Sequence, residues 1–99
     1  MILTQLVYLR PGKEAEFQEF EEVALPLMAK YGGELLLRIR PTPGSVVASE
    51  GEPPYEIHVI RFGSSEDLER FSQDPERKGV LHLKEASVRT TMLVRGEVV

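Results

Sequence analysis

The sequence predicts an α+β fold in which strands and helices follow the order β-α-β-β-α-β. Short runs rich in β-branched and aromatic residues alternate with Pro- and Gly-containing breaks. Two longer segments between them carry apolar residues at helical spacing. This order is that of the ferredoxin-like arrangement, a four-stranded antiparallel sheet with both helices on one face. The 99 residues are sufficient for one domain, spanning 1–99.

The first strand and the first helix are predicted over residues 2–9 and 13–31. The helix has one apolar face, made of Phe17, Phe20, Ala24, Leu27 and Tyr31. Pro26 lies inside this pattern, so we expect a kink there. Gly32 or Gly33 is expected to end the helix in the left-handed conformation. The acidic residues of this segment are expected on its wet side: Glu14, Glu16, Glu19, Glu21 and Glu22.

The rest of the chain supplies three more strands and the second helical region. We expect strands over 34–40, 55–62 and 89–95, and a short extension at Val46-Val47. Ser64 and Asp67 have capping-box spacing, which predicts a helix start. Asp74 before Pro75 predicts a second start, with that helix running to about Ala86.

The composition excludes several classes of protein. The net charge is −4 and the basic residues are scattered, so we expect no nucleic-acid partner. There is no cysteine, which excludes disulfides, thiol catalysis and thiolate zinc sites. No apolar run approaches the ~20 residues of a membrane span. MILTQLVYLR, at the N-terminus, lacks the features of a signal peptide, so we expect a cytoplasmic protein without a membrane partner.

The third strand, YEIHVIRF, contains two polar residues in an apolar segment. Successive strand residues point to opposite faces of a sheet. If the apolar pair Ile57 and Val59 lies under the helices, then His58, Ile60 and Phe62 face away from them.

The open face of the sheet, on this assignment, is a large apolar surface. Arg38 shares it with His58, whereas Arg61 lies at the strand end and is peripheral. The other apolar residues expected there are Leu36 and one set from each outer strand: Ile2, Leu6 and Tyr8 or Leu3, Val7 and Leu9 in the first, and Met92 and Val94 or Leu93 in the last. A second copy of the chain is the simplest cover for such a face, which predicts a homodimer.

Four polar side chains each have two interpretations, one in ligand binding and one in structure. His58 is either a general base or ligand hydrogen-bonder in a cavity, or a satisfied interface histidine. Arg38 either binds an anionic or carbonyl group of a ligand, or pairs with an acidic residue of the partner chain. Tyr8 and Tyr31 either donate hydroxyls to a ligand or pack in the core.

The sequence predicts no metal and no cofactor. His82 and Glu85 have a spacing that can hold a metal, but no third ligand is evident. The glycines lack phosphate-loop spacing, and no set of nucleophile, base and orienting group can be assembled.

Four segments of the chain resemble members of the dimeric α/β-barrel superfamily: LRPGKEAEF, LPLMAKYGGELL, EIHVIRFGSSEDLERF and DPERKG. The nearest resemblance is to NIPSNAP-like proteins and to a sister family of small bacterial proteins of unknown function. It implies two sheets packed face to face, with a cavity between sheet and helices or between sheet and partner.

Relatives in this superfamily include cofactor-independent monooxygenases, lactone isomerases and haem-degrading enzymes. In the monooxygenases an aromatic residue near the end of the third strand lines the cavity, with a polar residue four positions earlier. The matching positions are Phe62 and His58, although phenylalanine lacks the polar group of a tryptophan or tyrosine. Analogy to the distant haem-degrading relatives is the one ground for a haem role of His82; fold analogy is a weak warrant, so we expect no haem.

Three functions remain open from the sequence. The first, which we favour, is a homodimer that binds a small, partly apolar ligand through Tyr8, Arg38, His58 and Phe62. The alternative is a cofactor-independent enzyme, monooxygenase- or isomerase-like, acting on a small aromatic or ketone-like compound with His58 as the catalytic residue. The third is a structural or regulatory dimer whose cavity is filled by side chains.

Overall fold

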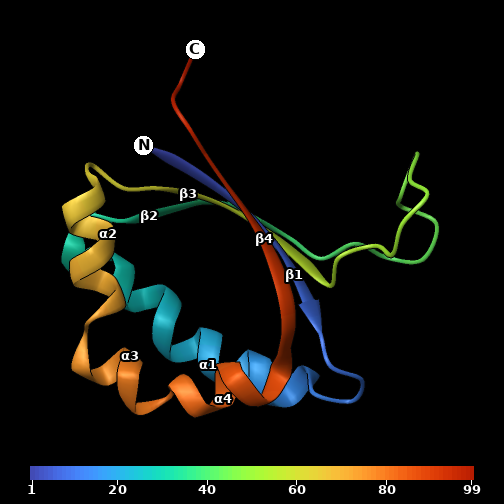
Figure 1. Cartoon of the computed structure of the whole chain (residues 1–99), viewed down its shortest axis with the longest axis horizontal. Coiled ribbons are helices and arrows are strands. Elements are labelled where there is room, and N and C mark those ends of the chain that lie inside the picture. The colour runs from blue at the N-terminus through green and yellow to red at the C-terminus, as the bar shows by residue number, and fades with distance from the viewer.

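Four strands and a layer of helices make up the computed structural model, which describes all residues 1–99 (Figure 1). The elements are β1 (Ile2–Leu9), α1 (Glu14–Leu27), the 3-10 helix η1 (Met28–Tyr31), β2 (Glu34–Ile39), β3 (Glu56–Arg61), α2 (Ser65–Ser72), α3 (Pro75–Gly79), α4 (Leu81–Ser87) and β4 (Val88–Gly96). The sheet order is β2-β3-β1-β4, and all neighbouring strands are antiparallel. The helices lie on one side of the sheet (Figure 1). The predicted ferredoxin-like α+β fold is confirmed.

Local capping rules account for where the helices begin and end. The Ser64 side chain accepts a hydrogen bond from the Asp67 N–H, at 3.1 Å. Asp74 likewise accepts from the N–H groups of the first turn of α3. Gly32 has φ +74° and ends η1, as predicted, because only glycine enters this left-handed region without steric strain. The next residue, Gly33, donates its N–H to the Met28 carbonyl at 2.8 Å.

Three predicted elements differ in detail. The second helical region is divided at Val80 into α3 and α4 instead of running unbroken. In the helix predicted over residues 13–31, the α-helical part ends at Leu27, directly after Pro26, and the chain continues as η1. Val46-Val47 forms no strand: it lies in the exposed loop between β2 and β3, which extends away from the sheet (Figure 1). None of the helices is long and apolar enough to cross a membrane.

The face assignment of the third strand is wrong. Glu56, His58, Ile60 and Phe62 are buried on the helix side, where Ile60 and Phe62 form a core cluster with Leu3 and Met28. Their neighbours Ile57 and Val59 point to the open face. The prediction failed because it placed the purely apolar pair, Ile57 and Val59, under the helices. The helix side instead holds Glu56 and His58, whose polar groups bond to each other and to Arg38 of β2.

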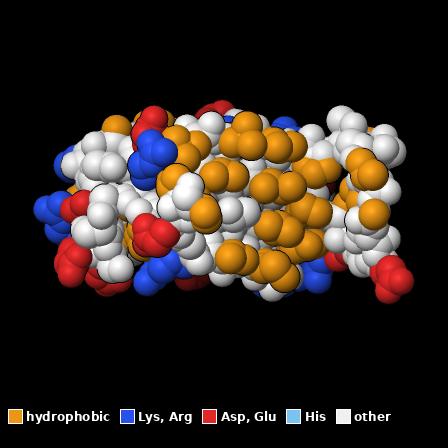
Figure 2. All heavy atoms as spheres, turned by 90° about the horizontal axis from the view of Figure 1, so that it is seen from above, with side chains coloured by type: hydrophobic (Ala, Val, Ile, Leu, Met, Phe, Trp, Pro, Cys, Tyr) orange, Lys and Arg blue, Asp and Glu red, His pale blue; other side chains and the backbone are white.

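The open face of the sheet is nevertheless as apolar as predicted (Figure 2). The cross-strand pairs place one set of residues together on it: Leu6, Leu37, Ile39, Ile57, Val59, Met92 and Val94. We call these seven residues the open-face patch. Several of its members are about half exposed, including Leu37 at 49% and Met92 at 55%. A patch of this kind is unusual on an isolated soluble domain.

Candidate functional site

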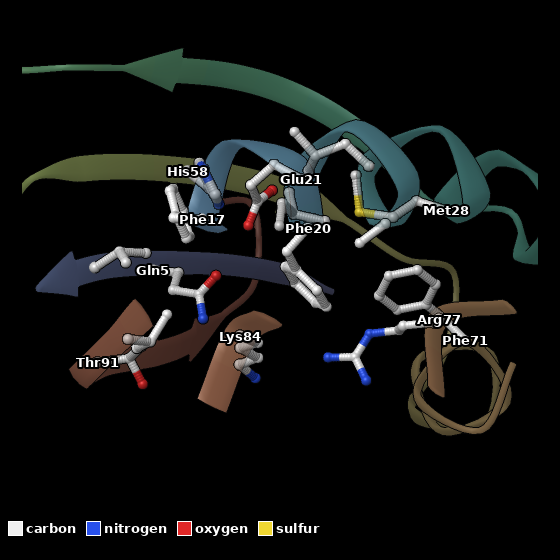
Figure 3. Close-up of a pocket in the computed structure, with 15 residues that line it drawn as sticks. Gln5, Phe17, Phe20, Glu21, Met28, His58, Phe71, Arg77, Lys84 and Thr91 are labelled. Atoms are coloured by element: carbon white, nitrogen blue, oxygen red, sulfur yellow. The ribbon is translucent and has the colours of Figure 1, made fainter. Parts of the chain in front are cut away.

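A cavity of about 70 Å³ lies between the sheet and the helices (Figure 3). We call it the inner cavity. Its walls are mainly apolar, and its polar side chains are Gln5, Glu21, His58, Arg77, Lys84 and Thr91. A water molecule occupies about 30 Å³ in the liquid, so the cavity has room for a small polar group or a few atoms of a ligand.

A wider groove of about 570 Å³ adjoins the inner cavity. We call it the outer groove. It is lined by α2 and by the helix-facing side of the sheet, including Phe62 of the core and Leu93 and Arg95 of β4. Six residues line both spaces: Gln5, Met28, Ile60, Phe71, Arg77 and Lys84. The two spaces together could hold a molecule whose end reaches into the inner cavity.

His58 is held in the floor of the inner cavity by a buried carboxylate. His58 is 1% exposed and Glu56 is 0% exposed, and His58 Nε2 lies 2.6 Å from Glu56 Oε1. Arg38 Nε donates to the same carboxylate at 2.5 Å and Arg40 Nη2 at 2.8 Å. Burial opposes ionisation of Glu56, but these hydrogen bonds outweigh it and lower the pKa to about 2.

The ionised Glu56 fixes the orientation and the tautomer of the His58 ring. A carboxylate only accepts hydrogen bonds, so the ring must carry its proton on Nε2. In the neutral ring Nδ1 then keeps its lone pair, and no protein group bonds to it. The arrangement gives His58 the orienting partner that a general base requires.

Glu21 is the acidic residue that lines the inner cavity. It is 7% exposed, it makes no hydrogen bond or ion pair with the protein, and its carboxyl points into the cavity (Figure 3). Burial raises its pKa, partly offset by the nearby His58. The prediction that Glu21 belongs to the wet side of the helix is wrong. Its position four residues after Phe17 and three before Ala24 places it on the buried face.

Arg77 and Lys84 bring positive charge to the same space. Neither forms an ion pair, and Arg77 Nε is buried without a hydrogen-bond partner. Desolvation lowers the pKa of both groups. Neither residue was predicted from the sequence, although their spacing held a signal. They lie three residues before and four residues after Val80, which falls on the apolar pattern of this region.

The structure does not bring the four predicted ligand-binding residues together in one site: these are Tyr8, Arg38, His58 and Phe62. His58 lines the inner cavity and Phe62 the outer groove. Arg38 is on the same side of the sheet as His58, as expected, but it is bonded to Glu56 and lines neither space. Tyr8 is on the open face, where the Arg89 guanidinium lies 5.8 Å from its ring centre.

The other polar residues that the sequence singled out have structural partners or lie apart. The Tyr31 hydroxyl donates to Asp74 at 2.5 Å. Arg61 pairs with Glu34 at the strand end, outside both spaces. No three His, Asp or Glu side chains lie close enough together to hold a metal ion.

Solved structures with this architecture come from several bacteria. A protein of unknown function from Rhodopseudomonas palustris matches 99% of this chain and 81% of its own, with a TM-score of 0.83 and 15% identity. An uncharacterised NIPSNAP domain protein from Burkholderia xenovorans matches 94% of this chain and 88% of its own, with a TM-score of 0.69 and 12% identity. A protein of unknown function from Jannaschia sp. CCS1, described as dimeric and ferredoxin-like, covers 99% of this chain and 100% of its own, with a TM-score of 0.67 and 19% identity.

These matches define the chain as a ferredoxin-like α+β protein related in fold to NIPSNAP domains, as the sequence predicted. The family model of the domain of unknown function DUF1330 matches residues 6–97. The chain therefore belongs to the DUF1330 family. No curated protein matches it.

Proposed function

We propose that this protein binds a small, partly apolar molecule in the inner cavity and the outer groove. The observation that carries the proposal is Glu21, a residue that is 7% exposed and whose carboxyl lines the cavity without a hydrogen bond or ion pair to the protein. Burial raises the pKa of this carboxyl, because its ionised form is unfavourable there unless a polar group bonds to it. A bound hydroxyl, amide or water would satisfy it, and the apolar walls suit a partly apolar ligand.

Binding is tested by screening small aromatic and ketone-like compounds for an increase in melting temperature. We expect compounds that stabilise the wild type to lose their effect on Glu21→Leu, which removes the carboxyl and narrows the cavity. Glu22→Leu, at the exposed neighbouring position, is the matched control and should retain the effect. If Glu21→Leu responds like the wild type, the molecules bind elsewhere and the proposal fails.

The protein is proposed to act as a homodimer through the open-face patch. Apolar residues from all four strands line this patch, those of β2 and β4 are exposed, and two of the structurally similar proteins are described as dimeric. A standard interface buries ~800 Å² on each partner, an area that one face of a four-stranded sheet can supply. Light scattering should give twice the 11.2 kDa of one chain. Val59→Lys should shift the mass towards the monomer, while Val47→Lys in the loop should not.

The second candidate is a cofactor-independent enzyme that moves a proton within a ketone-like compound. It is favoured by one observation: Glu21 and His58 both face the inner cavity, and Glu56 orients the ring of His58. One group would remove a proton from the carbon beside a carbonyl, and the other would donate a proton to the resulting enolate. The test is deuterium exchange into a bound ketone in D₂O. Exchange that persists unchanged in His58→Gln would contradict this role.

A further inference from the structure

Arg77 and Lys84 are the two basic residues that are partly buried and form no ion pair; the other four unpaired ones, Arg10, Lys13, Lys78 and Arg95, are exposed. Six other basic side chains form ion pairs with an acidic residue: Lys30, Arg38, Arg40, Arg61, Arg70 and Arg89. Arg77 and Lys84 form none, although both line the inner cavity and the outer groove. Two cations thus line the same spaces, partly out of water, and neither forms an ion pair.

The electrostatics of this pair call for an anion. Lys84 has its pKa lowered by desolvation and then by the charge of Arg77, so the two groups repel each other. Glu21 is the acidic residue that acts on both, but it makes no ion pair with either. An anion bound between the cations would relieve the repulsion.

The Arg77 guanidinium is positioned before any ligand arrives. It lies 5.2 Å from the ring centre of Phe71 and 5.6 Å from that of Phe20. One of its nitrogens, Nη1, donates weakly to the Ser72 carbonyl at 3.4 Å, while Nε is buried without a partner. The two neighbouring rings limit the conformations of the side chain, so little freedom is lost on binding. An unused, buried N–H is the donor that a planar two-oxygen acceptor would satisfy.

We propose that Arg77 and Lys84 anchor the carboxylate of a small carboxylic acid whose apolar body lies along the cavity walls. This inference rests on the proposed function and names its ligand class. The carboxylate is placed where the inner cavity meets the outer groove, because both cations line both spaces. The far end of the ligand would reach Glu21 and His58, which can hydrogen-bond a hydroxyl or carbonyl oxygen. A carboxylate fits better than a phosphate dianion, whose second charge makes entry into an apolar space more unfavourable.

The test compares acids with their uncharged amides in matched pairs. Phenylacetate and phenylacetamide, benzoate and benzamide, and inorganic phosphate are titrated into the full chain, and binding is followed by NMR through backbone amides and the Arg77 Nε–H resonance. We expect each acid to bind at least about tenfold more tightly than its amide, and to shift the Nε–H resonance. Arg77→Gln and Lys84→Gln should each remove most of this preference. Lys78→Gln, at an exposed position on the same helix, is the control and should not.

The outcomes separate this inference from the proposed function. If acids and amides bind equally well at the cavity, the anchor is wrong and cavity binding stands. If phosphate binds more tightly than the carboxylates, the ligand class is wrong. If no compound perturbs cavity resonances at millimolar concentration, the anchor fails together with the cavity site. If the acids bind but Lys78→Gln weakens them as much as Arg77→Gln, general surface charge accounts for the binding and the anchor is overturned.

Discussion

Replacing Glu56 by glutamine tests how the charged network under the helices contributes to stability. The substitution keeps the shape of the side chain and removes the charge that Arg38, Arg40 and His58 share. The shift of the Glu56 pKa from 4.5 to about 2 corresponds to about 3 kcal/mol. The side chains of Arg38 and Arg40 are 30% and 48% exposed, so water screens part of the interaction. We therefore expect Glu56→Gln to lower the free energy of unfolding by about 2 kcal/mol at pH 7.

The pH dependence of this loss has a definite sign. The pKa of Glu56 is lower in the folded state, so its stabilisation is fully present above the unfolded value of 4.5 and decreases as the pH falls towards 2. The difference between wild type and variant should thus shrink below pH 4.5. At about pH 3 less than half of it should remain.

Urea unfolding at pH 7 and pH 3, followed by far-UV circular dichroism at one fixed protein concentration, measures both quantities. Glu34→Gln is the control, because Glu34 also pairs with an arginine but is 63% exposed. We expect it to change the stability by less than about 0.5 kcal/mol. A Glu56→Gln loss as small as that of the control would show that the buried charge does not stabilise the fold. So would a loss of equal size at both pH values.

Two further predictions concern a glycine pair and the unpartnered carboxyl. A Cβ added at Gly33 would lie 2.6 Å from the Phe62 ring, so we expect Gly33→Ala to lower stability by about 1–3 kcal/mol in thermal unfolding. At Gly32, with φ +74°, valine should lower it by more than about 1 kcal/mol, and unchanged melting temperatures would contradict both expectations. The raised pKa of Glu21 makes the wild type lose stability as the pH rises above 4.5. The free energy of unfolding of Glu21→Gln, measured with urea, should therefore rise relative to that of the wild type between pH 4 and pH 7. A difference between the two proteins that stays constant with pH would show that Glu21 ionises normally.

The helix ends were predictable because each depends on a few adjacent residues. Ser64 and Asp74 cap helices through bonds to N–H groups two or three positions ahead. Gly32 follows the last helical residue, where the left-handed conformation is needed. Such signals are local, so the element order and the fold class follow from the sequence alone.

The faces of the strands were not predictable in the same way. A β-bulge between Leu35 and Leu37 inserts one residue, Leu36, into β2. It resets the alternation, so that Arg38 lies beside His58 on the helix side while Leu37 pairs with Val59 on the open face. No turn residue or proline in this stretch marks the bulge. The general prediction of an apolar second face survived, because both residue sets of the strands are largely apolar.

The candidate site depended on that same choice of face. With His58 under the helices, the acidic residue Glu56 is buried there too, and it is bonded to Arg38 of β2, to Arg40 just after β2 and to His58 of β3. Glu21 comes from α1 on the opposite wall and has no such partners. A buried charge network that satisfies itself can be explained by the stability of the fold. A largely buried carboxyl without a partner in the protein cannot, since burial disfavours its ionised form. Glu21, more than the better-bonded histidine, is therefore the residue that points to a ligand.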